Sequence, residues 1–229
     1  MKFCRYGVTL KRITAEDLEL VRFWRNSQQI RNNMIYKEYI TPEMQLKWFE
    51  TVNNYNNFFY IIQVNNDSIG LIDNKNTDWS IGTTESGLFL FDEKYFDTHY
   101  PIAASFILIE IGFFILNGKD AFIKVLRSNK RAIEYNSQLG FEPFNDDGEK
   151  AYIELILTKE NIIRKTSNLR KAMNSLQSAD DPYLYLYLDA ADRKSGIAQT
   201  IESVFETLPA DIRVKKEIRG DEIILCFNI

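Results

Sequence analysis

The chain has 229 residues, of which 45% are hydrophobic and 26% charged, so it has ample material for a globular core. Its net charge of −4 and its pI near 5.3 argue against a general nucleic-acid binder, which usually presents a basic face. Two cysteines at opposite ends of the chain and a single histidine exclude a disulfide framework and a His-rich metal site, and they favour a reducing cytoplasm.

The N-terminal half predicts one strand, three helices and then three strands. Its first ten residues, MKFCRYGVTL, lack the apolar core and the cleavage site of a signal peptide. Thr14 precedes acidic residues and Thr41 precedes a proline, and both patterns are typical of helix starts. The expected elements are a strand at Val8–Ile13, helices at Thr14–Trp24, Gln28–Met34 and Pro42–Val52, and strands at Phe58–Val64, Ser68–Asp73 and Thr84–Phe91.

The most apolar run of the chain extends from Ile102 to Leu116. It is too short to span a membrane and contains Glu110, so it predicts a buried helix that begins at Pro101.

A compact strand–helix–strand pattern follows. The β-prone run Ala121–Leu126 leads into a helix at Lys130–Gln138, and Gly140 stands where a left-handed C-terminal cap is needed. The run Tyr152–Leu157 then predicts the last strand of this part of the chain.

The spacing of Asn129, Ala132 and Gly140-Phe141 resembles the second acyl-CoA-binding segment of the GNAT superfamily, the acyl-CoA-dependent N-acyltransferases. Taken alone, the segment also fits an ordinary strand–helix–strand with a glycine cap. The element order β-α-α-α-β-β-β-α-β-α-β, from Val8 to about Thr158, matches the GNAT core as well. The resemblance implies an α+β fold over residues 1–159, with a central mixed, largely antiparallel sheet flanked by helices.

Acetyl-CoA or a longer acyl-CoA is the co-substrate that this resemblance implies, with no metal. The pantetheine is expected along the strand Thr84–Phe91 and the pyrophosphate over the Pro101 helix. Asp97 and His99 stand where the family has two glycines, and His99 is alternatively a loop residue without a role. The implied cofactor-binding residues are Phe89, Leu90, Phe91, Lys94, Thr98, His99, Tyr100, Asn129, Ala132 and Asn136.

In many family members a glutamate of the strand equivalent to Thr84–Phe91 accepts the proton of the attacking amine, and Glu85 holds a matching place. Asp73 and Asp78 are the alternative bases, and Glu85 is alternatively an exposed strand carboxylate. Asn136 replaces the tyrosine that commonly protonates the leaving thiolate, so the thiolate leaves unassisted or another group helps. The expected catalytic residues are Glu85, Asn136 and His99.

The first helices resemble those of two GNAT groups, which acylate nucleotide-linked aminosugars or acetylate ribosomal protein N-termini. The similar segments are Phe23-Trp24-Arg25-Asn26, Ile30-Arg31, Thr41-Pro42-Glu43 and Trp48-Phe49. Arginines can hold phosphate oxygens, and aromatic rings can stack on a sugar or base. Core packing of the tryptophans and solvated arginines are the alternatives. The expected acceptor-binding residues are Arg25, Asn26, Arg31, Tyr39, Trp48 and Asp73.

Residues 160–229 lie beyond the resemblance and predict an α-β-α-β-β extension. Its elements are a helix at Glu160–Gln177, a linker at Ser178–Pro182, a strand at Tyr183–Leu188, a helix at Ser195–Leu208 and a hairpin at Arg213–Phe227. Such a segment is marginal as an independent domain, so we expect it to dock on the core sheet or to contribute to a homodimer contact.

The resemblance implies an N-acyltransferase that moves an acetyl or longer acyl group from acyl-CoA to the amino group of a dTDP- or UDP-linked amino sugar, by direct attack in a ternary complex. A ribosomal-type protein N-terminal acetyltransferase and a catalytically decayed GNAT-like binding module are the alternatives. No nucleic-acid or membrane partner is expected.

Overall fold

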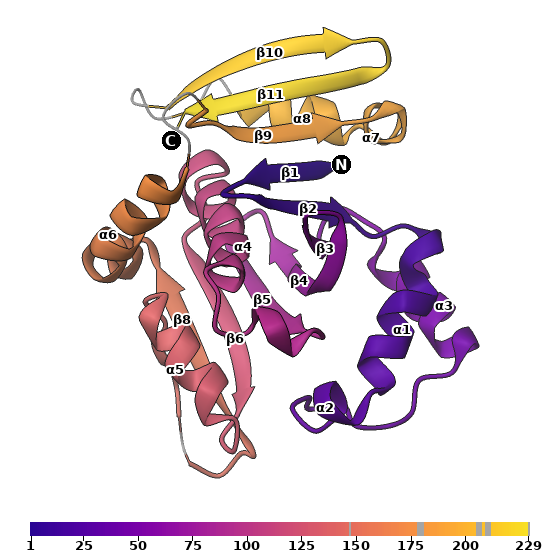
Figure 1. Ribbon diagram of the computed structural model, residues 1–229, viewed down its shortest axis with the longest axis vertical. Coiled ribbons are helices and arrows are strands. Elements are labelled where there is room, and N and C mark those ends of the chain that lie inside the picture. Colours follow the sequence, from indigo (N-terminus) through magenta and orange to yellow (C-terminus); the bar gives the residue numbers. More distant parts are fainter. Residues whose placement is uncertain (147, 178–180, 205–207, 209–211, 229) are drawn as a thin grey trace.

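The computed structural model describes residues 1–146, 148–177, 181–204, 208 and 212–228 (Figure 1). Within these residues the centre of the fold is a sheet of eleven strands in the order β10-β11-β9-β1-β2-β3-β4-β5-β6-β8-β7. Its strands are β1 (Lys2–Arg5), β2 (Val8–Arg12), β3 (Phe58–Val64), β4 (Asp67–Asp78), β5 (Thr83–Leu90), β6 (Asp120–Leu126), β7 (Glu142–Pro143), β8 (Tyr152–Thr158), β9 (Leu184–Leu188), β10 (Arg213–Arg219) and β11 (Glu222–Asn228). All neighbours are antiparallel except β5 and β6, which confirms the mixed, largely antiparallel sheet.

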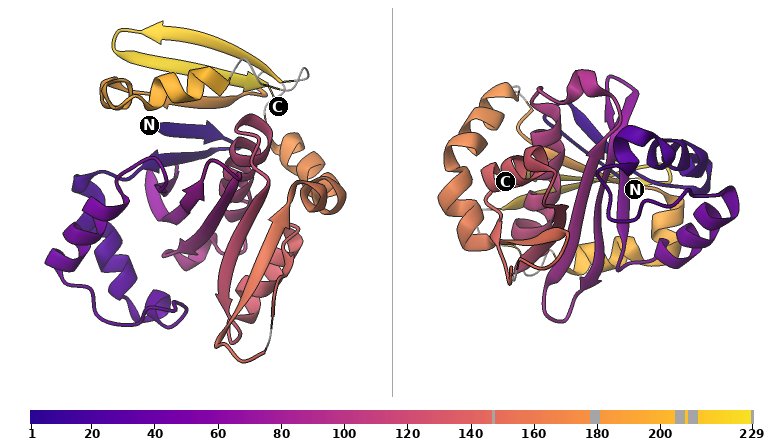
Figure 2. Two further views of the ribbon diagram at one scale, coloured as in Figure 1. Left: turned by 180° about the vertical axis from the view of Figure 1, so that it is seen from behind. Right: turned by 90° about the horizontal axis from the view of Figure 1, so that it is seen from below.

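Helices cover both faces of this sheet. They are η1 (Ala15–Asp17), α1 (Leu18–Asn26), α2 (Gln28–Arg31), α3 (Pro42–Val52), η2 (Glu93–Tyr95), α4 (Tyr100–Ile109), its π-helical continuation η3 (Glu110–Ile115), α5 (Lys130–Gln138), α6 (Lys159–Leu176), α7 (Ala190–Ser195) and α8 (Ile197–Val204). Seen from below, α5 and α6 lie on one side of the sheet and α1 and α3 on the other (Figure 2). The sheet flanked by helices confirms the predicted α+β class.

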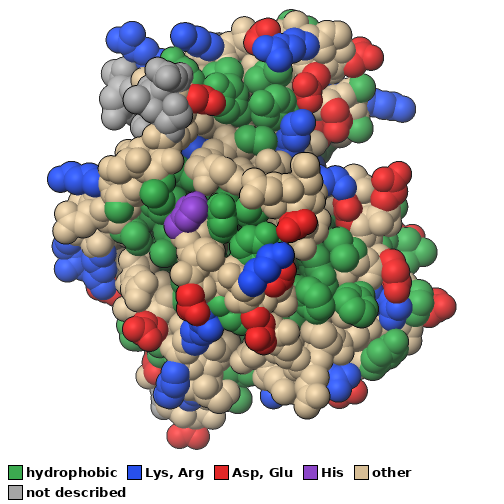
Figure 3. All heavy atoms as spheres, viewed as in Figure 1, with side chains coloured by type: hydrophobic (Ala, Val, Ile, Leu, Met, Phe, Trp, Pro, Cys, Tyr) green, Lys and Arg blue, Asp and Glu red, His purple; other side chains and the backbone are tan. Residues whose placement is uncertain are grey.

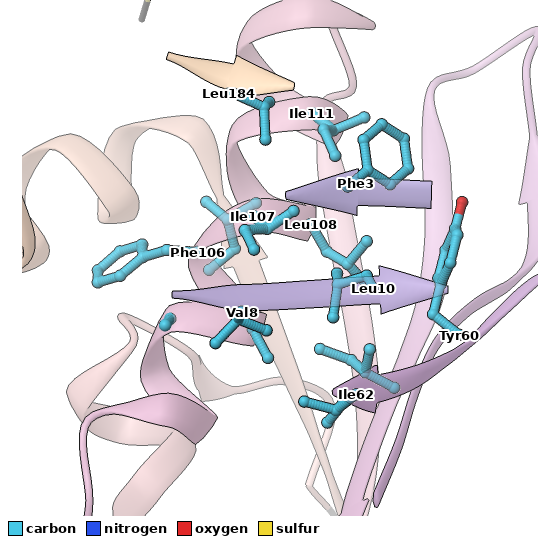
Figure 4. Close-up of a cluster of buried hydrophobic side chains, with 14 of the residues drawn as sticks. Phe3, Val8, Leu10, Tyr60, Ile62, Phe106, Ile107, Leu108, Ile111 and Leu184 are labelled. Carbon is cyan, nitrogen blue, oxygen red and sulfur yellow. The ribbon is translucent and has the colours of Figure 1, made fainter. Parts of the chain in front are cut away.

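Two apolar clusters hold these layers together. On one face, Val21 and Trp24 of α1 pack with Phe59, Ile61 and Leu71 of β3 and β4. On the other face, α4 packs against β1, β2 and β3, and the close-up view shows the side chains from both sides interdigitating (Figure 4). Both clusters follow from strand alternation, because successive side chains point to opposite faces.

Two helix caps expected from the sequence form, one at the start of α3 and one at the end of α5. The Thr41 hydroxyl accepts a hydrogen bond from the Met44 amide at 3.3 Å, with Pro42 in the first turn. Gly140 follows α5 with φ of +97°, the left-handed conformation predicted for it.

The C-terminal segment continues the core sheet. Strand β9 pairs antiparallel with β1, placing Leu186 opposite Phe3, and β11 pairs with the other edge of β9. These pairs extend the sheet beyond β1, whose backbone groups would otherwise form an open edge.

A buried ion pair fixes this junction. Arg5 of β1 donates to Glu110 Oε2 at 2.7 Å, and both side chains are at most 3% exposed. The Tyr6 hydroxyl donates to Glu110 Oε1 at 2.9 Å, and Arg5 Nε donates to Gln177, just after α6. The first helix of the extension, α6, is therefore tied to the core through Arg5.

Several predicted elements differ from the structure. The sequence analysis missed β1, a strand of four residues. It ended the third predicted strand at Asp73, whereas β4 reaches Asp78, and it ended the second helix at Met34, whereas α2 ends at Arg31. It began a helix at Ser195, whereas α7 starts at Ala190 behind an Asp189 capping box, and Gly196 at φ +88° separates it from α8. Residues 205–207 of that expected helix and residues 178–180 of the expected linker lie outside the described residues.

Candidate active site

The central feature of the site is the point at which β5 and β6 separate. The two strands pair only over Thr83–Glu85 and Asp120–Phe122. Beyond Glu85, no described strand pairs with the β6 side of β5, so the backbone groups on that edge are free to bind a ligand. A cavity of about 1180 Å³ passes through this gap and is lined by residues from both faces of the sheet.

On the face covered by α1 and α3, four charged side chains form a row. Lys75 Nζ lies 3.2 Å from Asp73 Oδ1 and 3.4 Å from Glu85 Oε1, and Lys124 Nζ lies 3.3 Å from Glu85 Oε2. Gly87 sits directly opposite Asp73 in the sheet, and a Cβ at position 87 would lie only 2.6 Å from Asp73 Oδ2. Glycine at this position therefore gives the Asp73 carboxylate its space.

The surroundings shift the pKa values of the two carboxylates in opposite directions. Burial raises the pKa of Asp73, which is only 7% exposed, and the Lys75 ammonium offsets this in part. Burial alone would also raise the pKa of Glu85, but Lys75 and Lys124 outweigh it and hold the pKa of Glu85 below its usual value. Asp73 is therefore a stronger base, and Glu85 a weaker base, than the same group is in water.

Two residues that line this side of the cavity each have a buried nitrogen without a hydrogen-bond partner among the described residues. These atoms are Arg25 Nε and Gln45 Nε2. Gln45 is only 4% exposed, so its unpaired amide group is desolvated. A buried donor left unpaired typically costs about 1–3 kcal/mol. Such donors are suited to bind the acceptor oxygens of a ligand.

The other predicted acceptor-binding residues take different positions. Trp48 lines the cavity and packs edge-on against Phe59 at 4.9 Å. Asn26 binds the backbone of Ile40 through both ends of its amide. Arg31 and the exposed Tyr39 are not among the cavity-lining residues.

The expected cofactor side is partly assembled. Five of the predicted residues line the cavity: Phe89, Leu90, Asn129, Ala132 and Asn136. Asn129 caps α5 by accepting a hydrogen bond from the Ala132 amide at 3.1 Å, and the Asn136 amide donates to the Ala132 carbonyl at 2.7 Å. The remaining predicted residues, Phe91, Lys94, Thr98, His99 and Tyr100, do not line it.

Those residues have other contacts at and before the start of α4. Phe91 stacks on Trp24 at 5.9 Å. Lys94 pairs with Asp92 at 3.0 Å, and the Thr98 hydroxyl donates to the Tyr95 carbonyl. His99, the purple side chain in Figure 3, lies at the surface with its ring 4.1 Å from that of Tyr100.

Sequence reasoning missed several lining residues. Arg131 of α5 lies over the Phe96 ring and 2.6 Å from Asp97, which occupies one of the missing-glycine positions. Tyr135 donates to the Pro101 carbonyl at 2.8 Å, lies 2.7 Å from Ser105 Oγ, and has a pKa that burial raises. The adjacent cations Lys130 and Arg131 were the one feature of the sequence that could have indicated a positively charged wall on the cofactor side.

Among the described residues, no group of three or more His, Cys, Asp or Glu side chains could hold a metal ion. The described helices also include none with the length and apolarity needed to cross a bilayer.

Known structures share this fold. The spermidine N-acetyltransferase of Vibrio cholerae, solved with CoA and spermine, superposes with a TM-score of 0.63 at 12% identity, over 70% of this chain and 100% of that one. The N-acetyltransferase PseH of Campylobacter jejuni, solved with acetyl coenzyme A, gives 0.50 at 20% identity over 66% and 99%. A domain from Methanocaldococcus jannaschii gives 0.56 at 22% identity over 66% and 97%.

No family model and no curated protein matches the sequence. At these identities the likeness shows the fold alone: an α+β sheet flanked by helices, as in the GNAT acetyltransferases.

Proposed function

We propose that the chain is an N-acyltransferase that moves an acyl group from acyl-CoA to the amino group of a nucleotide-linked amino sugar. The observation that carries the proposal is the separation of β5 and β6 after only three paired residues, with one cavity open to both faces of the sheet. A donor held on the α4–α5 face and an acceptor held on the α1–α3 face can meet in such a gap.

The cofactor side fits an acyl-CoA. The unpaired edge of β5 can hydrogen-bond to the amides of a pantetheine arm, which pair like an added strand. The N-terminus of α4 and the Arg131 guanidinium supply positive potential for phosphates, and the pairing of Arg131 with Asp97 offsets the carboxylate's repulsion. The bound thioester would supply an activated carbonyl carbon.

On the acceptor side, residues of the chain can accept the proton that the attacking amine loses. The attacking nitrogen forms a bond to the carbonyl carbon as the carbon–sulfur bond breaks, and the nitrogen must lose a proton. The Asp73 carboxylate is suited to take it, because burial raises the pKa of Asp73, whereas Lys75 and Lys124 lower the pKa of Glu85. Asn136 lines the cofactor side, where the second N–H of its amide can donate a hydrogen bond to the departing sulfur, whereas the Tyr135 hydroxyl already donates to the Pro101 carbonyl.

The charge of the acceptor wall supports an anionic acceptor. Asp73 and Glu85 are already paired with Lys75 and Lys124, and Arg25 adds a further positive charge. Together with the free Gln45 donor, this wall suits phosphate or hydroxyl oxygens better than a polyamine.

The first test is binding. At 100 times its dissociation constant, acetyl-CoA should stabilise the protein by about 2.7 kcal/mol, or about 5–11 °C in Tm for a chain of this size. Turnover should then be compared among a dTDP-linked amino sugar, a UDP-linked amino sugar, an N-terminal peptide and spermidine. The highest kcat/KM for the peptide or spermidine would refute the acceptor assignment, and the absence of any shift would favour the non-enzymatic module.

The second test uses Gln45→Leu, with Gln28→Leu on the exposed surface as its matched control. Removing a buried unpaired amide should not lower stability, yet it should raise the KM of the acceptor about tenfold. The Kd of acetyl-CoA should not change. A stability loss without a KM effect would instead assign Gln45 a structural role.

A further inference from the structure

The cavity does not end where β5 and β6 separate. It continues along the α4 face of the sheet toward the C-terminal segment. We call this extension the apolar arm and define it by six lining residues: Phe3, Phe58, Tyr60, Leu116, Ile197 and Ile201.

The floor of the apolar arm is the sheet itself. Phe3 of β1 and Tyr60 of β3 meet edge to face with ring centroids 5.6 Å apart, as the close-up view shows (Figure 4). Phe58 lies on the same face as Tyr60, two residues earlier on β3. Asn74 stands opposite Phe58, and Ser86 stands opposite Asn74, so this row leads directly to the separation of β5 from β6.

The roof comes from two segments. Leu116 directly follows η3, and Ile197 and Ile201 lie one turn apart on α8. Helix α8 belongs to the C-terminal extension, residues 160–229, for which the sequence analysis predicted docking or a dimer contact but no chemical role. Without α8, the apolar arm would be an open groove.

Hydrogen bonds tie the end of α7, two residues before α8 begins, to the core. The Tyr55 hydroxyl, on the loop before β3, donates to the carbonyl of Ser195 at the end of α7. The Trp79 indole in the β4–β5 connection donates to the Tyr55 carbonyl at 3.0 Å. The same ring packs edge-on against Phe58 at 6.1 Å. Two core loops therefore brace the roof near the outer end of the arm.

The two faces of the sheet differ in polarity at the gap. The α1–α3 face carries Asp73, Lys75 and Glu85. On the α4 face, the lining residues of β3, β4 and β5 are all uncharged: Phe58, Tyr60, Ile72, Asn74, Thr84, Ser86, Leu88 and Leu90. A ligand that turns from the gap into the arm meets apolar or neutral groups along these strands.

We propose that the apolar arm binds the aliphatic chain of the acyl donor, so that the group transferred is a medium-length saturated acyl group. The inference rests on the proposed function, because it places the thioester in the gap between β5 and β6. The acyl chain is the expected occupant because the apolar arm is continuous with the gap between β5 and β6 and lies on the face expected to hold the pantetheine. An acetyl group would leave the arm empty, whereas a chain of several methylenes would fill it.

Calorimetric titration with CoA, acetyl-CoA, butanoyl-CoA and octanoyl-CoA tests the proposal. Each methylene that enters the arm should tighten binding by up to about fourfold. Octanoyl-CoA, with six more methylenes than acetyl-CoA, should therefore bind at least roughly 30-fold more tightly even with partial burial.

Two variants locate the chain. Ile201→Trp narrows the roof from α8, and Leu116→Trp narrows it independently from the end of η3. Each should abolish most of the octanoyl-CoA advantage while leaving the Kd of acetyl-CoA unchanged. The control is Ile163→Trp, because Ile163 is an exposed isoleucine on α6 that does not line the cavity.

Acetyl-CoA and octanoyl-CoA binding with equal affinity to the unaltered protein would overturn the inference and leave the proposed function intact. An octanoyl-CoA advantage that survives both tryptophan variants would overturn the location of the chain. If neither CoA nor any thioester binds, the proposed function itself fails, and the inference fails with it.

Discussion

Replacement of Asp73 and Glu85, one at a time, separates the two candidate bases. Asp73→Asn should lower kcat by about 10²–10⁴, the usual contribution of a general base, with little change in the Kd of acyl-CoA. Lys75 keeps Glu85 as a partner 3.4 Å away, so the replacement does not leave a buried cation unpaired. Glu85→Gln should have a much smaller effect on kcat.

The pH dependence gives a sharper signature. A base must be deprotonated to act, so activity falls as the pH drops through its pKa. Burial raises the pKa of Asp73 above its ordinary 3.8, whereas the pKa of Glu85 lies below its ordinary 4.5. An Asp73 base therefore places the acid limb of the profile above pH 3.8, a Glu85 base places it below pH 4.5, and Asp73→Asn should remove the limb that Asp73 sets.

Neighbouring charges should move the limb in opposite directions. The negative charge of Glu85 raises the pKa of Asp73 and the positive charge of Arg25 lowers it. Glu85→Gln should thus shift the acid limb to lower pH, and Arg25→Met should shift it to higher pH. The assay is thiol release from acetyl-CoA with the best acceptor of the turnover comparison. A 10²-fold or greater loss for Glu85→Gln, with near-normal turnover by Asp73→Asn, would refute the assignment.

Three further changes follow from individual contacts. Glu110→Gln leaves Arg5 as an unpaired buried charge and should lower the unfolding free energy by about 3–5 kcal/mol, or Tm by about 6–20 °C, in calorimetry. Glu217→Gln breaks an exposed pair and should leave Tm nearly unchanged; equal shifts would contradict this reasoning. Arg131→Ala should weaken acyl-CoA binding about tenfold, less at high salt, and a salt-independent loss would argue against a phosphate contact. Gly87→Ala places a methyl group against the Asp73 carboxylate, and if Asp73 is the base the change should lower kcat at least tenfold, so normal turnover would show that the carboxylate is not needed there.

Most core elements could be predicted because local chemistry specifies them. The start of α3 follows from Thr41 and Pro42, and its end falls at the predicted Val52. The bounds of β3 and α5 were also predicted correctly, the first from a β-prone run before a tight turn and the second from an Asn cap and a glycine stop.

The elements that were missed depend on distant partners. Strand β1 has four residues and exists because β2 pairs with one edge and β9, about 180 residues later, pairs with the other. No local pattern in MKFCR specifies such a pairing. The buried Glu110 was visible in the sequence, but its partner Arg5 could be identified only in three dimensions.

The position of a candidate site residue could be predicted where the residue type has one well-defined role in local structure, such as capping a helix. The amide of Asn129 caps α5 and lies on the cavity wall, so its position followed from the helix start. Gln45 could not be found in this way, because it is a buried polar residue in the otherwise largely exposed helix α3, and no local pattern marks it. Arg131 and Tyr135 each lie one residue before a position that the resemblance emphasises, Ala132 and Asn136.

The wrong end of β4 has the same cause as the chemistry of the site. A strand with one buried face alternates apolar and polar residues, and that pattern breaks down after Ile72 because both faces of the sheet border the cavity. Asp73 and Lys75 face the acceptor side while Asn74 faces the apolar arm, so three consecutive polar residues continue the strand where sequence rules indicate a loop. The neighbouring strand β5 has the same loss of alternation at Glu85-Ser86-Gly87. A strand whose two faces both border a ligand cavity carries polar residues on both faces, so the alternation of apolar and polar residues that would identify it as a strand is lost. The polar segments of β4 and β5 therefore mark where the two ligands are expected to meet.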